Sequence, residues 1–162
     1  MRFQAGEVVR IYGYEIVVWV SLAAREVVEP SGLPCFPALL DTAHTHNFSI
    51  QEEHLVRWAG LRPEALPFGR GSVRGQGRRL PLRAAQLWLH GNEPGSWDRL
   101  AKPSLHRLLV PEGIIIYPSG AHFPRLPLLG LRAILRNKLH LYVDGGTGLV
   151  HLRTRRRWWP FG

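Results

Sequence analysis

The chain has 162 residues, of which 45% are apolar and 20% charged, proportions that fit a folded protein and exclude a disordered one. The length is that of one domain, which we expect to span residues 1–152, with a basic and aromatic tail at 153–162. The 13 prolines and 17 glycines favour turns and short strands over long helices. Cys35 is the single cysteine, which excludes an internal disulfide and a cysteine-based zinc site and fits the reducing cytoplasm.

The net charge is +9, from 21 Lys and Arg against 12 Asp and Glu. Much of it is local, at Arg70, Arg74, Arg78, Arg79 and Arg83 and again at Arg153, Arg155, Arg156 and Arg157. Such patches can bind phosphates or acidic partners. We favour a solvated surface over a nucleic-acid interface here. The tail RTRRRWWPF also suits nucleic acid or a membrane surface, but we favour packing of its two tryptophans on a partner subunit.

Residues 15–24 form the most apolar run near the start of the chain. The run is too short to cross a bilayer, and Glu7 and Glu15 stand where a signal peptide would be basic. We therefore expect a buried strand, no membrane association and a cytoplasmic protein.

The elements predicted for the first half of the chain include a strand that ends at a candidate site. In chain order we expect two strands or one bent strand over 7–28 with a break at Gly13, a loop over 30–37, a short apolar strand over 38–40 that runs into Asp41, and a helix over 51–60 stopped by Gly60. Glu52 and Glu53 in the first turn of that helix complement its dipole.

The second half reads as strands with one more short helix. In chain order we expect a mobile, glycine-rich hairpin or loop over 69–77, a strand over 80–89, a turn region over 90–98, a short buried strand over 113–117, an apolar segment over 126–129, a helix over 131–139, and a hairpin formed by 139–143 and 149–152.

The informative motif is Leu39-Leu40-Asp41-Thr42-Ala43, followed by Asn47-Phe48-Ser49-Ile50. A carboxylate at the end of an apolar strand is costly unless it is hydrogen-bonded or functional. The small residues after it allow a tight turn whose hydroxyl and N–H groups hold that carboxylate. A buried Asp that caps a turn is the alternative from the motif alone.

The order of the parts resembles that of the retropepsin-like aspartic peptidases, single-domain relatives of pepsin. In that family an apolar pair precedes Asp-Thr/Ser-Gly, a glycine-rich flap follows, and an apolar-apolar-Gly segment lies beside the catalytic turn before a short helix. Here the corresponding parts are Leu39 to Ala43, the stretch 69–77, and Leu128-Leu129-Gly130 followed by LRAILRNKL. The resemblance covers residues 8–152 and implies an insertion at 91–108.

The resemblance implies a mostly β, retropepsin-like closed barrel with one or two short helices. It implies a homodimer in which Asp41, Thr42 and Ala43 of each chain form the catalytic turn, with no cofactor. Peptide or protein substrate is expected to bind under a flap containing Gly69, Gly71, Gly75 and Gly77, near His44 at the mouth of the cleft. Leu128, Leu129 and Gly130 are expected to support the catalytic turn.

Ala43 departs from the family pattern, which has glycine at that position. Its methyl group can be tolerated or can push the two catalytic turns apart. The first alternative is therefore a catalytically silent, dimeric peptide-binding module of the same fold. The second is a nucleic-acid-binding protein that uses the Arg-rich segments.

Several histidines suggest a metal site, since His44 and His46 are two residues apart and would share one face of a strand. His54 follows nearby, but beyond Asp41 and the distant His90 the sequence offers no convincing third ligand. We therefore expect no metal.

Overall fold

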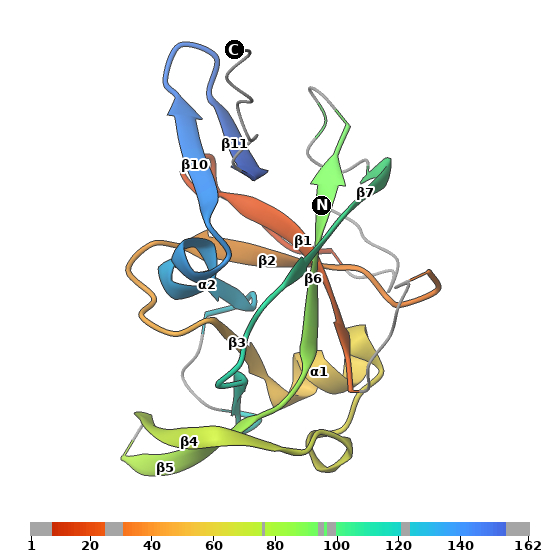
Figure 1. Ribbon diagram of the computed structural model, residues 1–162, viewed down its shortest axis with the longest axis vertical. Coiled ribbons are helices and arrows are strands. Elements are labelled where there is room, and N and C mark those ends of the chain that lie inside the picture. The colour runs from red at the N-terminus through yellow and green to blue at the C-terminus, as the bar shows by residue number, and fades with distance from the viewer. Residues whose placement is uncertain are drawn as a thin grey trace, which may run out of the picture.

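A computed structural model of the protein describes residues 8–24, 31–75, 77–93, 96, 100–120 and 124–154, with the backbone alone at 101–105. The described chain is mostly β, with two short α-helices (Figure 1). In chain order the elements are β1 (Val17–Ala23), β2 (Phe36–Asp41), β3 (Phe48–Gln51), α1 (Glu52–Ala59), the 3-10 turn η1 (Pro63–Ala65), β4 (Phe68–Gly75), β5 (Arg78–Arg83), β6 (Gln86–Asn92), β7 (Leu100–Leu108), β8 (Ile114–Tyr117), β9 (Leu128–Gly130), α2 (Leu131–Arg136), β10 (Leu139–Asp144) and β11 (Leu149–Thr154).

Nine strands form one sheet in the order β4-β5-β8-β3-β9-β2-β1-β6-β7. β4 and β7 stand at its two ends, so over the described residues the sheet is open. The predicted mostly β fold is confirmed, whereas the closed barrel is not. A barrel needs hydrogen bonds between its first and last strands, and the described ladders join β4 to β5 and β7 to β6.

β1 lies inside the sheet because its sequence suits burial on both faces. The run Val17–Ala23 is buried at every position after the first, and it pairs antiparallel with β2 and with β6. A continuous apolar run, rather than an alternating one, is the pattern of a strand covered on both sides. The expected buried strand near the N-terminus is therefore confirmed.

Helix α1 covers one part of the core. Glu52 and Glu53 occupy its first turn, and Leu55, Trp58 and Ala59 form its buried face. Gly60 ends the helix at φ 67°, a left-handed conformation that glycine adopts without strain. The ring centroids of Trp58 and the fully buried Phe36 of β2 are 6.3 Å apart, so the helix is packed on the strand that carries Asp41.

β9 lies between β2 and β3 and is the shortest strand in the sheet. It runs parallel to β2, with Leu39 opposite Leu128, Leu40 opposite Leu129 and Asp41 opposite Gly130. It runs antiparallel to β3. Two segments that are distant in the sequence thus form one ladder at the end of which Asp41 lies.

Two of the expected strands differ from the observed ones. Within 7–28 the expected break at Gly13 is confirmed, because Gly13 lies in a turn in which the Glu15 N–H donates to the Tyr12 carbonyl oxygen at 3.0 Å. The expected strand before it is wrong, since residues 9–12 form no strand, and residues 25–28 lie outside the described residues. The expected strand over 80–89 is two strands, β5 and β6. The chain leaves β5 after Arg83, where the Ala84 N–H donates to the Pro67 carbonyl oxygen at 2.7 Å.

The expected hairpin in the glycine-rich stretch is confirmed, but it is a packed element, which corrects the expectation that it is not packed. β4 and β5 form an antiparallel hairpin, and Val73 and Leu80 lie directly opposite each other. Leu80, Leu82 and Ile115 form a second apolar cluster, and Val73 and Tyr117 pack against it. The expected insertion at 91–108 contains β7, which pairs with β6 at the far end of the sheet.

The expected C-terminal hairpin is confirmed as β10 and β11, which form a separate two-stranded sheet. The expected helix before it is shorter than 131–139, since α2 ends at Arg136 and Lys138 has φ 52°. Residues 155–162 of the predicted tail lie outside the described residues. No helix in the described part of the chain is long and apolar enough to cross a membrane.

We expect Gly130→Ala to destabilise the fold strongly. A Cβ at this position would lie 1.9 Å from the carbonyl oxygen of His46 and 2.5 Å from that of His44, and these are backbone atoms that side-chain rotation cannot move. The free energy of unfolding, measured by urea titration, should fall by about 3 kcal/mol or more. Gly145→Ala, where a Cβ would meet nothing within 4 Å, is the control and should change it by less than about 0.5 kcal/mol. Equal effects of the two substitutions would contradict this packing.

Candidate active site

Asp41 is the last residue of β2 and is half-buried. Its side-chain Oδ1 accepts a hydrogen bond from the Ala43 N–H at 2.9 Å, and its backbone carbonyl oxygen accepts one from the His44 N–H at 3.2 Å. Thr42 and Ala43 between these contacts are exposed. The motif therefore forms the tight turn that the sequence predicted, with one backbone donor on the carboxylate.

The backbone beside this turn is held by Gly130 and Asn47. The Gly130 N–H donates to the Asn47 carbonyl oxygen at 3.0 Å, and Gly130 is the register partner of Asp41. The structure thus brings the predicted Asp41 to Ala43 turn and the predicted Leu128 to Gly130 segment together. Leu128 and Leu129 are buried, so they anchor the segment in the core.

His44 lies next to the turn and is fixed by a buried hydroxyl. Its Nε2 and the Oγ of the fully buried Ser49 are 2.7 Å apart. Burial lowers the pKa of His44, and the neighbouring His46 lowers it further, whereas the Asp41 carboxylate opposes both effects. The ring centroids of His44 and His46 are 5.6 Å apart in an edge-to-face arrangement. Close to Asp41 the structure therefore favours a neutral imidazole.

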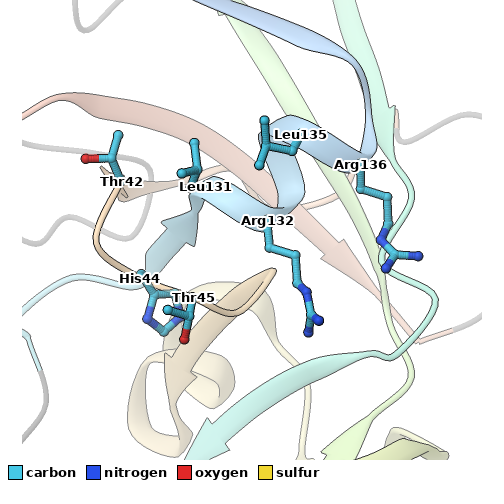
Figure 2. A pocket seen from close by; sticks show the side chains of 7 residues that line it. All are labelled: Thr42, His44, Thr45, Leu131, Arg132, Leu135 and Arg136. Atoms are coloured by element: carbon cyan, nitrogen blue, oxygen red, sulfur yellow. The ribbon is translucent and has the colours of Figure 1, made fainter.

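An open pocket of about 560 Å³ lies between this loop and α2 (Figure 2). One side is formed by Thr42, His44 and Thr45, and the other by the α2 residues Leu131, Arg132, Leu135 and Arg136. Its lining combines leucine side chains with two arginines and includes no carboxylate. Burial and the charge of Arg132 both lower the pKa of His46 on the same loop.

The four glycines predicted to bind substrate belong to the β4–β5 hairpin and do not line this pocket. A Cβ on Gly69 would lie 2.5 Å from the Glu112 carbonyl oxygen, and one on Gly75 would lie 3.1 Å from the Tyr117 ring. Gly71 and Gly77 have positive φ values and open space around them. In Figure 1 the tip of the hairpin and the β2–β3 loop both extend to the left of the molecule, separated from each other.

Sequence reasoning includes Asn47 and Ser49 in the motif but gives their side chains no role, and it misses Glu112 altogether. The sequence predicts a strand at Ser49 without indicating a role for its hydroxyl, and Glu112 follows a proline in a turn without any periodic pattern. The Asn47 Nδ2 donates to Glu112 Oε2 at 2.9 Å across 65 residues of sequence. No local sequence pattern predicts a contact between residues so far apart in the chain.

The chemistry that this site offers is that of a single ordered carboxylate. Over the described residues, no group of three or more His, Cys, Asp or Glu side chains is arranged to hold a metal ion. A lone carboxylate can act as one member of an acid–base pair but needs a second group for the opposite role.

Comparison of the chain with family models, with curated proteins and with solved structures gives no match.

We expect His44→Ala to destabilise the protein, more at pH 8 than at pH 5. Loss of the imidazole leaves the buried Ser49 hydroxyl without its partner, at a cost of about 1–3 kcal/mol. Because the folded state lowers the pKa of His44, the unfolded chain takes up the proton first as pH falls through about 6.5. The stabilisation that neutral His44 gives the wild type is therefore lost in acid. The difference in free energy of unfolding between wild type and His44→Ala should shrink from pH 8 to pH 5.

Urea unfolding of both proteins at the two pH values measures this difference. The exposed His140, on β10, supplies the control His140→Ala, for which we expect little change at either pH. A difference between wild type and His44→Ala that stays constant from pH 8 to pH 5 would contradict a neutral, half-buried His44.

Proposed function

We propose that the protein is an aspartic endopeptidase of retropepsin type that hydrolyses peptide bonds through an Asp41 dyad formed by two copies of the chain. The observation that carries the proposal is the ladder in which Asp41, at the end of β2, pairs in parallel with Gly130 of β9. This ladder is the arrangement that the resemblance implied for the catalytic turn and its supporting segment. Over the described residues β4 and β7 are the end strands of the sheet and are not paired with each other. Closure of the sheet into a retropepsin-like barrel is therefore also a proposal.

The proposed mechanism needs two carboxylates because one cannot be acid and base at once. Two Asp41 side chains about 3 Å apart across a two-fold axis would share one proton and titrate as a pair. The ionised member takes a proton from a bound water while the protonated member polarises the peptide carbonyl. The water oxygen then attacks the carbonyl carbon, and the amine leaves with a proton, without a covalent enzyme intermediate.

The other residues have supporting roles in this proposal. The Ala43 N–H holds the Asp41 carboxylate, and the exposed Thr42 lies where a second catalytic turn would approach. The β4–β5 hairpin is the proposed flap, which closes over an extended peptide and excludes water. Neutral His44 lies beside the dyad at the mouth of the cleft. A cytoplasmic location is also proposed, and the free, buried Cys35 supports it.

A second candidate is the catalytically silent peptide-binding module, and Ala43 is the residue that favours it. Ala43 is exposed and adjacent to Asp41, so its methyl group lies at the surface that a second turn would meet. If the methyl keeps the two turns apart, the carboxylates cannot share a proton, while the proposed flap can still hold a peptide.

We expect the wild type to cleave an unfolded protein substrate between pH 4 and pH 8, and Asp41→Asn to lose that activity. An amide cannot take the proton from water, so the rate should fall by about 10²- to 10⁴-fold. Asp144→Asn makes the same chemical change in the exposed β10–β11 turn and should leave cleavage unchanged. Fragment formation, followed by mass spectrometry at matched dimer content, measures the effect.

Absence of cleavage by the wild type, in a folded and dimeric preparation, would reject the peptidase. Binding of an extended peptide by that same preparation would then support the silent module. Equal cleavage by wild type and Asp41→Asn would place the activity elsewhere.

We expect Ala43→Gly to strengthen association of the two copies and to raise the cleavage rate. Removal of the methyl group lets the two turns approach more closely. Sedimentation equilibrium measures the dimer dissociation constant, and the peptidase assay measures the rate. An unchanged or weaker dimer would show that the methyl group does not separate the turns.

A further inference from the structure

Glu112 lies in the turn before β8 and contacts three segments that surround the candidate site. Its backbone carbonyl contacts the root of the β4–β5 hairpin, and its two carboxylate oxygens contact the β2–β3 loop and α2. The carboxylate is partly exposed, with 26% of its side-chain surface accessible. The sequence around Glu112 carries no motif that indicates a role for it.

The contact with the hairpin is made by backbone atoms. The Arg70 N–H donates to the Glu112 carbonyl oxygen at 3.0 Å. Gly69 approaches the same oxygen so closely that a Cβ there would lie 2.5 Å from it. The root of the hairpin therefore keeps its bond to the Glu112 peptide unit whatever side chain residue 112 carries, so any added motion of that peptide unit reaches the hairpin.

The contact with the loop is made by the side chain. Glu112 Oε2 accepts a hydrogen bond from Asn47 Nδ2 at 2.9 Å, and Asn47 is 3% exposed. The Asn47 backbone oxygen accepts from the N–H of Gly130, the register partner of Asp41. Asn47 Oδ1 is buried without a hydrogen-bond partner over the described residues, which is costly. The hydrogen bond from Asn47 Nδ2 to Glu112 explains why an asparagine occupies this buried position although its Oδ1 has no partner.

The contact with α2 is an ion pair. Arg136 donates to Glu112 Oε1 at 2.6 Å, and Arg136 lines the pocket beside Thr42. The hydrogen bond from Asn47 holds the pKa of Glu112 below its ordinary value, and the charges of Arg136 and Arg132 act in the same direction. The carboxylate is thus ionised at neutral pH and can accept both bonds at once.

We propose that Glu112 is a positioning residue that couples the β4–β5 hairpin to the Asp41 loop, so that peptide held by the hairpin and the order of the catalytic turn are linked. The inference rests on the proposed function for its catalytic consequence, but the coupling itself is a property of the fold. A peptide that pulls on the hairpin shifts the Glu112 peptide unit, and the same residue transmits that shift through Asn47 to the segment beside Asp41.

Glu112→Gln tests the coupling because it leaves the backbone contact with Arg70 intact. A neutral amide oxygen can accept from Asn47 or from Arg136 but does not replace the charged carboxylate toward both. Amide hydrogen exchange is then measured for 43–47 and for 70–75, in the full chain without substrate. Loss of the charge-assisted bonds should raise exchange by about tenfold in both segments.

Asn47→Leu removes the same link from the loop side while keeping bulk, so it serves as the second variant and should give the same joint rise. Glu53→Gln removes an exposed ion pair with Arg57 on α1 and is the matched control, for which we expect no change in either segment. A rise confined to 43–47 in both link variants would overturn the coupling, because the hairpin would then be independent of the loop.

The peptidase assay adds the catalytic readout. Coupling predicts that Glu112→Gln lowers kcat and raises KM together, whereas a purely structural loss of folded protein lowers the apparent kcat alone. A changed KM with an unchanged kcat would overturn the link to the catalytic turn. If the wild type does not cleave, the proposed function fails, and the exchange experiment still decides the coupling.

Discussion

The close approach of the Gly130 backbone to the carbonyl groups of His44 and His46 is the contact on which the rest of the site depends. It allows β9 to lie between β2 and β3, two strands that follow each other in the chain. Any side chain at residue 130 would separate these strands. Because Gly130 is also the residue before α2, the same contact sets where that helix begins and where the pocket beside Thr42 lies.

Most polar groups around Asp41 are paired through a small set of specific contacts, while Asn47 Oδ1 stays unpaired over the described residues. The carboxylate accepts the Ala43 N–H, the Ser49 hydroxyl meets His44, and Asn47 meets Glu112. Buried polar groups cost free energy unless they are paired, so these contacts keep the loop in one conformation. The loop is therefore ordered before any ligand arrives. The charge of Arg136 is balanced by Glu112, and none of the ion pairs found among the described residues involves Asp41.

Much of the local structure could be predicted, because it rests on local signals. The helix ending at Gly60, the strand ending at Asp41 and the hairpin around residues 144–146 follow from glycine positions and apolar periodicity. The failures arise where pairing with distant segments overrides composition. The glycine-rich stretch becomes the strand β4 because β5 pairs with it, and the pattern over 80–89 divides into two strands because the Ala84 N–H donates to the Pro67 carbonyl oxygen.

The sequence by itself determined the mostly β class, the tight turn at Asp41 and the segments that flank it, because each depends on residues within a few positions of one another. Tertiary structure alone decided that Gly130 faces Asp41, that Ser49 fixes His44, and that Glu112 joins three elements. It also decided that the sheet stays open between β4 and β7 over the described residues. Such contacts join residues far apart in the chain, and their free energy depends on burial and geometry that no local pattern encodes.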